Sequence, residues 1–179
     1  MGRDKALIRF DGATLLERAV NRLRQVCDPI FVAAGSRRIE VAGCTTVEDA
    51  APGSGPLGAL AAALHASPHR VTAAVAVDMP WVDAALLRLL LGRIGDHDAC
   101  VPVSDHGPEP LHAVYSGASV QACEAALASA DPSLRGFLAR VRVRYVSEDE
   151  WRCAGIAPGF ARNVNTPADL ARLRSSPVR

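Results

Sequence analysis

The sequence predicts an α/β fold in one domain, with a mainly parallel sheet covered by helices on both faces. Short β-branched and apolar runs alternate with segments that repeat apolar residues at helical spacing, and strands separated by helices are joined by crossovers. The run 72–77, Thr-Ala-Ala-Val-Ala-Val, is almost wholly apolar, which suits a strand buried on both faces. In a sheet of this kind, ligands bind at the carboxyl ends of the strands.

The individual elements follow from the same patterns. Strands are expected at residues 30–34, 45–47, 71–77, 99–103, 111–115 and 141–146. Apolar residues recur at helical spacing within 15–23, 86–91 and 120–127, and an Ala-rich helix follows residue 58. Thr166 can cap a final helix with Pro167 at its first position. We expect residues 1–174 to form the domain and 175–179 to be a frayed tail.

Composition excludes several classes of protein. The chain has 179 residues, 49% of them hydrophobic, and its 20 basic and 19 acidic residues give a net charge of +1. A dedicated nucleic-acid binder would carry a basic excess. The five cysteines are scattered and form no C-x-x-C pair, which fits a reducing cytoplasm. No signal peptide is visible and the apolar run 57–64 is too short for a bilayer, so we expect a cytoplasmic protein without a membrane or nucleic-acid partner.

Two candidate site residues have side chains suited to phosphate chemistry. Lys5, in Met-Gly-Arg-Asp-Lys-Ala beside a glycine turn, can neutralise phosphate charge, although most lysines are solvated surface groups. Asp78 follows the expected buried strand directly, where a carboxylate can hold Mg²⁺ against phosphates. The alternative for Asp78 is that it only starts a turn before Pro80.

A glycine-rich segment supplies a second group of candidates. Glu48-Asp49 is followed by Pro-Gly-Ser-Gly-Pro-Leu-Gly at 52–58, in which Gly55 and Pro56 precede a helix. Glycines let backbone N–H groups approach a ligand, and a helix start favours an anion. An ordinary turn is an equally good interpretation, and Asp49 could either bind a base or cap the loop.

Two further residues carry weaker signals. Asn165, before the expected cap Thr166, could give a carbonyl oxygen to a metal, but asparagines before helices are more often turn formers. His112, at the start of an expected strand, could line a pocket.

Taken in order, these segments resemble the MobA family of molybdenum cofactor guanylyltransferases. MGRDKALIRFDGATLLERAV is similar to the family's M-G-x-D-K-A-L segment and first helix, and EDAAPGSGPLGAL to its E-D…P-G-x-G-P-L-x-G segment. AVDMPWV resembles C-D-M-P-F, and NVNTPADL resembles N-I-N-T-P-x-D-L. PEPLHAVYSG and SLRGFLARVRVRYV resemble the family's middle and late segments, so the likeness covers nearly the whole chain.

The resemblance implies a Rossmann-like three-layer sandwich and a role for each matching residue. Lys5 would bind nucleotide phosphates, Asp49, Gly55 and Pro56 would contact the nucleotide, and Asp78 would hold Mg²⁺ with help from Asn165. The implied reaction transfers GMP from GTP to the terminal phosphate of Mo-molybdopterin and releases pyrophosphate. A molybdoenzyme or a cofactor-insertion chaperone is the implied protein partner.

The sequence departs from the family pattern at its start and within the strand at 30–34. Family members place a strand and an L-A-G-G-x-S-x-R loop before M-G-x-D-K, whereas Met1 here lies inside that motif. We therefore expect an upstream extension of roughly a dozen residues, enough for one short strand and a loop. The missing strand would lie centrally, beside the strands that carry Asp78 and Ala33. Ala33 stands where some members carry an Asn that contacts the nucleotide.

Two other functions remain open from the sequence alone. A related cytidylyltransferase, or an enzyme acting on another phosphate, would have the same fold. A non-catalytic remnant or binding protein that has lost its phosphate loop would carry the same motifs.

Overall fold

The computed structural model describes residues 5–10, 12–35, 39–49, 53–164 and 169. The first half of the chain contains, in order, η1 (Lys5–Leu7), β1 (Arg9–Phe10), β2 (Ala13–Thr14), α1 (Leu15–Leu23), β3 (Phe31–Ala33), β4 (Thr45–Val47), α2 (Gly55–Ala66) and β5 (Val71–Val75). The second half contains α3 (Ala84–Arg93), β6 (Ala99–Ser104), β7 (Gly107–Pro108), β8 (His112–Ser116), η2 (Gly117–Ser119), α4 (Val120–Leu127), α5 (Leu134–Leu138), β9 (Val143–Val146), α6 (Glu148–Cys153) and η3 (Pro158–Ala161).

The largest sheet is built around β8. This strand pairs antiparallel with β5 on one side and with β6 on the other. β6 in turn pairs antiparallel with the short β7 and parallel with β9. The sheet is therefore mixed, and the expectation of a mainly parallel sheet is wrong. The reason is that β6 and β8 are connected through β7 without a helix between them, and a strand that returns without a crossover runs antiparallel.

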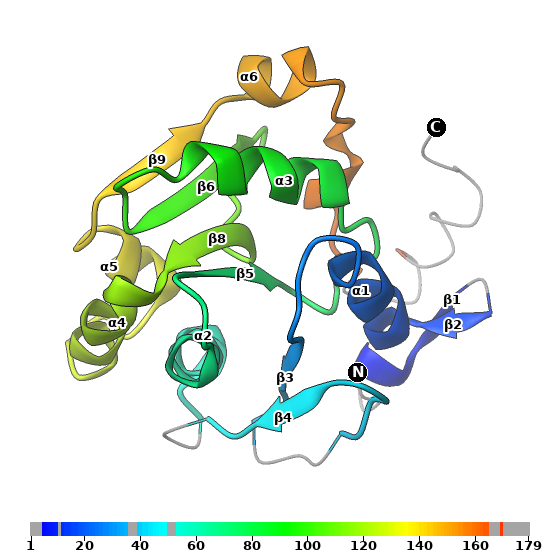
Figure 1. Cartoon of the computed structure of the whole chain (residues 1–179), viewed down its shortest axis with the longest axis horizontal. Helices are drawn as coiled ribbons and strands as arrows, with labels where there is room; N and C mark the ends of the chain where they lie inside the picture. The colour runs from blue at the N-terminus through cyan, green and yellow to red at the C-terminus, as the bar shows by residue number, and fades with distance from the viewer. Residues whose placement is uncertain (1–4, 11, 36–38, 50–52, 165–168, 170–179) are drawn as a thin grey trace.

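Helices cover both faces of this sheet, which confirms the predicted three layers (Figure 1). Ala113 and Tyr115 of β8 pack in one apolar cluster with α2, α4 and α5, whereas Val114 packs in another with α3 and α6. The alternation is the two-residue period of a strand. Full burial of a side chain as large as that of Val114 contributes about 1.5–3 kcal/mol.

The helices begin where the sequence offers caps. Thr14 accepts a hydrogen bond from the Glu17 N–H and the Glu17 carboxylate accepts one from the Thr14 N–H, a reciprocal cap for α1. Asp83 caps α3 through two backbone N–H groups, and Ser147 forms the same reciprocal cap with Glu150 at α6. Among the described residues, no helix is both long and apolar enough to span a bilayer.

The predicted strand limits shift where the backbone finds other partners. β5 ends at Val75 rather than at residue 77, because the chain turns there and the Met79 N–H donates a hydrogen bond to the Ala76 carbonyl oxygen. β9 begins at Val143 rather than at residue 141, because the Arg142 N–H donates to the Asp98 carboxylate. The expected helix after Thr166 and the frayed tail at 175–179 lie outside the described residues.

β3 and β4 form a separate parallel pair. Within the described residues, β3 pairs only with β4 and β5 only with β8, so one edge of β3 and one edge of β5 carry no strand. All five residues of β5 are partly exposed, which corrects the prediction of a strand buried on both faces. The physical reason is a cavity of about 580 Å³ along its open edge, lined by β3, β5, α1 and α2.

His112 does not line that cavity, so its prediction as a pocket residue is wrong. Its ring is fully buried and meets the Phe160 ring edge-on at 5.3 Å. The Asp83 N–H donates to His112 Nε2 at 3.4 Å. Burial lowers the pKa of His112 from 6.5 to about 4, although the Asp83 backbone and carboxylate oppose the shift.

This burial generates a prediction about acid stability. Between pH 6.5 and about pH 4, His112 is protonated in the unfolded chain but neutral in the folded chain. Folding stability is therefore lost as the pH falls through this window. The shift corresponds to about 3 kcal/mol of unfolding free energy. Urea unfolding of the wild type and of His112→Leu should show a free-energy difference that changes across this window. A difference constant from pH 7 to pH 4 would contradict a buried neutral histidine.

Candidate functional site

Lys5 and Asp78 meet at the carboxyl end of β5. The Lys5 Nζ lies 3.3 Å from Asp78 Oδ2, and the two side chains are 37% and 25% exposed. Ion pairs this exposed contribute only about 0–1 kcal/mol to stability. The fold therefore depends little on this contact, and both groups are accessible to a charged ligand.

The backbone of Asp78 is fixed by a residue far along the chain. The Val164 N–H donates to the Asp78 carbonyl oxygen at 2.8 Å, and Val164 is buried. This bond brings the chain that leads into Asn165 to the end of β5. Asn165 itself lies outside the described residues. This connection could not be predicted from the sequence, because a backbone hydrogen bond from an irregular segment requires no particular residue type.

Asp49 lies at the carboxyl end of the neighbouring strand pair, two residues beyond β4. It faces Gly35, which follows β3 with a φ of +63°: a β-carbon built there would lie 3.7 Å from Asp49 Oδ2. Asp49 Oδ1 is buried, and no donor from the described residues is within hydrogen-bond distance. Desolvation raises the pKa of Asp49. A buried carboxylate oxygen without a donor is suited to a hydrogen-bonding ligand.

The glycine-rich segment runs into α2 as predicted, but its glycines differ in role. Gly53 and Gly55 have φ values of +82° and +62°, which side chains rarely adopt. Pro56 occupies the first turn of the helix. Gly58 lies inside α2, where an added β-carbon would come within 1.7 Å of Ser54 Oγ. Gly58 therefore makes room for Ser54 and is a packing residue in this structure.

The two halves of the site face the same cavity. Pro56, at the start of α2, and Val77, next to Asp78, both line it. The start of α2, whose positive end stabilises anions, and the segment that leads into Asp78 therefore border one cavity. Asp78 and Asp49 offer the carboxylate oxygens that Mg²⁺ binds, usually one or two beside phosphates. The chemistry of these side chains fits a metal–phosphate ligand. Among the described residues, no cluster of three histidines, cysteines or carboxylates forms a complete metal cage.

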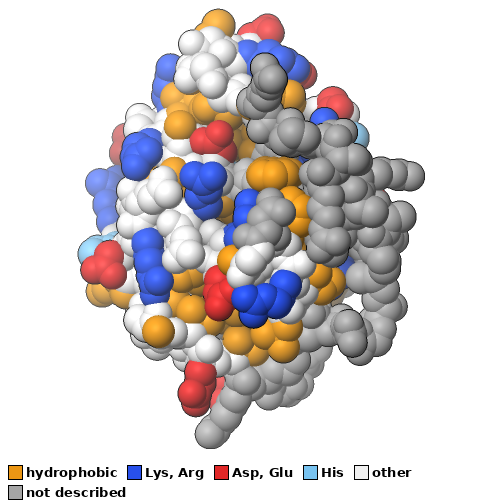
Figure 2. Space-filling view, turned by 90° about the vertical axis from the view of Figure 1, so that its right-hand side faces the viewer, with side chains coloured by type: hydrophobic (Ala, Val, Ile, Leu, Met, Phe, Trp, Pro, Cys, Tyr) orange, Lys and Arg blue, Asp and Glu red, His pale blue; other side chains and the backbone are white. Residues whose placement is uncertain are grey.

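The face that carries α1 shows no preference for one sign of charge. Figure 2 shows Lys and Arg side chains interspersed with Asp and Glu over the described atoms of this face. This distribution agrees with the net charge of +1.

The fold and these groups define a class of protein. Lysine, carboxylates and a helix start gather at the carboxyl ends of strands in a three-layer α/β domain, which is the arrangement of nucleotide-binding enzymes that handle phosphates.

Comparisons with known proteins agree with this class. The family model of the MobA-like NTP transferase domain matches residues 1–147. A probable molybdenum cofactor guanylyltransferase of Pelotomaculum thermopropionicum is 33% identical over 97% of this chain and 85% of its own length. The crystal structure of molybdopterin-guanine dinucleotide biosynthesis protein A from Archaeoglobus fulgidus superimposes with a TM-score of 0.81 and 25% identity, over 97% of this chain and 90% of that one.

A cytidylyltransferase has the same fold. The 2-C-methyl-D-erythritol 4-phosphate cytidylyltransferase of Thermus thermophilus matches 96% of this chain and 92% of its own with a TM-score of 0.69, at 18% identity. The chain belongs to the MobA-like NTP transferase family and is a nucleotidyltransferase. The fold by itself does not select the base.

The unpartnered oxygen of Asp49 generates a prediction about stability without ligand. Asp49→Asn removes a desolvated charge, so the melting temperature of the free protein should stay equal or rise. A control of known direction is Asp83→Ala, which removes the side-chain cap of α3 and should lower the melting temperature. Differential scanning fluorimetry at pH 7.5 measures both. A large loss of stability in Asp49→Asn would mean that this carboxylate is structural.

Proposed function

We propose that this protein transfers GMP from GTP to the terminal phosphate of Mo-molybdopterin. A phosphate oxygen of the pterin attacks the α-phosphorus of GTP, the bond from that phosphorus to the α–β bridging oxygen breaks, and pyrophosphate leaves. The nucleophile is already an anion, so the reaction needs no general base. A molybdoenzyme or a cofactor-insertion chaperone would receive the product.

The observation that carries the proposal is the Lys5–Asp78 pair near the end of β5, with a second carboxylate, Asp49, just beyond the end of β4. Two polyanions must be brought together here, and positioning and electrostatics supply most of such catalysis. The name of the Pelotomaculum relative supports molybdopterin and a guanine nucleotide as substrates.

Each residue has a distinct part in this proposal. Lys5 would exchange its contact with Asp78 for oxygens of the GTP phosphates and offset the charge that develops on pyrophosphate. Asp49 would accept hydrogen bonds from the nucleotide, close to the guanine. Gly55 and Pro56, at the positive end of α2, would lie against the nucleotide.

Asp78 would hold Mg²⁺, with Asn165 as a further oxygen ligand. When bound, this ion polarises the phosphoryl oxygens and neutralises their charge. The chain's own contribution is to fix Asp78 through the backbone bond from Val164.

The first test of this proposal is Asp78→Asn. Loss of a charged metal ligand should lower the rate of nucleotide transfer by at least about 100-fold, or about 2.7 kcal/mol of transition-state stabilisation. Formation of the dinucleotide cofactor from GTP and Mo-molybdopterin measures it, with Mg²⁺ in excess. The melting temperature should change little, because the ion pair is partly exposed.

The control for this variant is Asp96→Asn, an exposed carboxylate that pairs with Arg70 before the starts of β6 and β5. It carries the same chemical change at the opposite ends of these strands and should keep the wild-type rate. Wild-type activity in Asp78→Asn would remove this residue from the site.

The second test is nucleotide selectivity. A ligand that binds only the folded protein stabilises it by about 2.7 kcal/mol at 100 times its Kd. With Mg²⁺ present, GTP should raise the melting temperature more than CTP or ATP at equal concentration. A larger shift with CTP would favour the cytidylyltransferase instead, and no shift with any nucleotide would favour a non-catalytic remnant.

A further inference from the structure

An arginine packs against two aromatic rings near the end of β5. The guanidinium carbon of Arg18, on α1, lies 4.9 Å from the centre of the Phe10 ring and 5.7 Å from the centre of the Trp81 ring. The two rings meet edge-on, with their centres 5.7 Å apart. A guanidinium at such distances is attracted to the faces of the rings. These three residues, from α1, β1 and the segment between β5 and α3, form what we call the Arg–Trp cluster.

Two donors of this cluster have no acceptor. Arg18 Nε and Trp81 Nε1 are both buried, and neither has a hydrogen-bond partner among the described residues. Both groups can only donate hydrogen bonds, so only an acceptor can satisfy them. Buried donors without acceptors cost stability and are few in native proteins. Two of them in one cluster therefore indicate a missing acceptor.

Arg18 also lacks the acidic partner that many arginines of this fold have. Within the described chain it forms no ion pair, and its contacts with the two rings are its polar interactions. Other arginines of the described chain pair with carboxylates, namely Arg70, Arg93, Arg142, Arg144 and Arg152. The positive charge of Arg18 is therefore open to an anion from outside the fold.

The Arg–Trp cluster adjoins Asp78. Phe10 and Trp81 pack in one apolar cluster with Val77 and Val164. Val77 precedes Asp78 in the chain, and the Val164 N–H donates to the Asp78 carbonyl oxygen. The packing that holds the two unsatisfied donors is therefore the packing that positions the Asp78 backbone.

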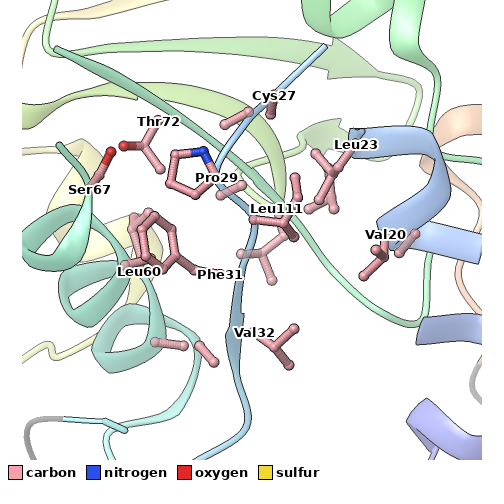
Figure 3. Close-up of a pocket in the computed structure, with 18 of the residues that line it drawn as sticks. Val20, Leu23, Cys27, Pro29, Phe31, Val32, Leu60, Ser67, Thr72 and Leu111 are labelled. Atoms are coloured by element: carbon pink, nitrogen blue, oxygen red, sulfur yellow. The ribbon is translucent and has the colours of Figure 1, made fainter. Parts of the chain in front are cut away.

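The cluster belongs to the α1 side of the domain. Figure 3 shows α1, with Leu23, on one side of β3 and α2, with Leu60, on the other. The residues proposed to contact the nucleotide at a helix start lie on α2. A ligand group held by Arg18 would therefore lie on the α1 side of the site, away from the start of α2.

We propose that Arg18 and Trp81 form a second phosphate subsite, which holds the terminal phosphate of the acceptor next to Asp78. This inference rests on the proposed function, in which the acceptor is a phosphate monoester. One phosphate oxygen can accept from the indole N–H while others accept from the guanidinium. Both side chains are partly exposed, so a small rotation brings their N–H groups to a ligand that arrives from solvent.

A separate cation for the acceptor has a physical reason. Lys5 contacts Asp78 and is proposed to bind the nucleotide phosphates, so its single charge serves one of two polyanions. Arg18 supplies a second positive charge at the same carboxylate. Its planar guanidinium suits a phosphate, because two of its N–H groups can bind two oxygens together.

The first experiment measures phosphate binding in the absence of other substrates. At constant ionic strength, inorganic phosphate should raise the melting temperature of the wild type relative to chloride. Arg18→Met keeps a long side chain against the rings but removes the donors, so it should abolish this rise. Trp81→Phe keeps an aromatic ring but removes the indole N–H, so it should reduce the rise.

The matched control is Arg22→Met, one turn further along α1. Arg22 is exposed, so the rise with phosphate should persist in this variant. Without phosphate, Arg18→Met should keep or raise the melting temperature, because it removes a buried donor that has no acceptor. A clear drop there would make Arg18 a structural residue. That drop, a wild type that phosphate does not stabilise, or a rise that persists in Arg18→Met would each overturn the subsite.

The second experiment assigns the phosphate to one substrate. In nucleotide transfer, Arg18→Met should raise the KM for Mo-molybdopterin by about tenfold or more, as expected when hydrogen bonds to a charged group are lost. The KM for GTP should stay unchanged. A rise in the KM for GTP alone would assign the subsite to the nucleotide and overturn the proposal. If phosphate binds at this cluster but the wild type forms no dinucleotide, the proposed function fails while the phosphate subsite stands.

Discussion

The insertion of β8 between β5 and β6 is the constraint on which the rest of the fold depends. Along its length β8 pairs with β5, and its side chains alternate between two apolar clusters that lie on opposite faces of the sheet. Four of its five residues are fully buried. Because its backbone groups must be paired, β8 holds β5 in place even though the other edge of β5 is open.

This fixed position of β5 is what makes a site at its end possible. Asp78 lies in the turn that follows β5, and the Val164 N–H donates to its backbone carbonyl oxygen from the other end of the chain. Lys5 reaches the same carboxylate from the first turn of the described chain. Residues from three distant parts of the sequence therefore meet at one strand end, and none of them contributes much to stability by this contact.

The cavity between β3 and β5 borders the same site, since Val77, next to Asp78, lines it. Near the end of β4, the Asp49 carboxylate is desolvated and its Oδ1 has no donor among the described residues. Groups left unsatisfied in this way often mark places where a ligand supplies the missing contact.

By itself, the sequence determined the α/β class, the three layers, the family, and the approximate positions of β3 to β6, β8, β9 and α1 to α4; it did not predict β1, β2, β7, α5 or α6. Helical and strand periodicity and the turn residues are local, so they can be read without knowing which elements touch. The motifs also identified Lys5, Asp49 and Asp78, whose roles stay predictions, and Asn165, which lies beyond the described residues.

Only the tertiary structure decided how these pieces are joined. Strand direction depends on the connection, so β8 turned out antiparallel where a parallel strand was expected. Burial depends on neighbours, so β5 is half-exposed despite its apolar sequence, and His112 is a core residue although histidine is usually more exposed. The Lys5–Asp78 pair joins residues 73 positions apart. Strand direction, burial and this pair all depend on residues distant in the sequence, and periodicity contains no information about them. Gly58 is different, because it makes room for Ser54 four residues earlier, and only the conformation of the chain there shows that contact.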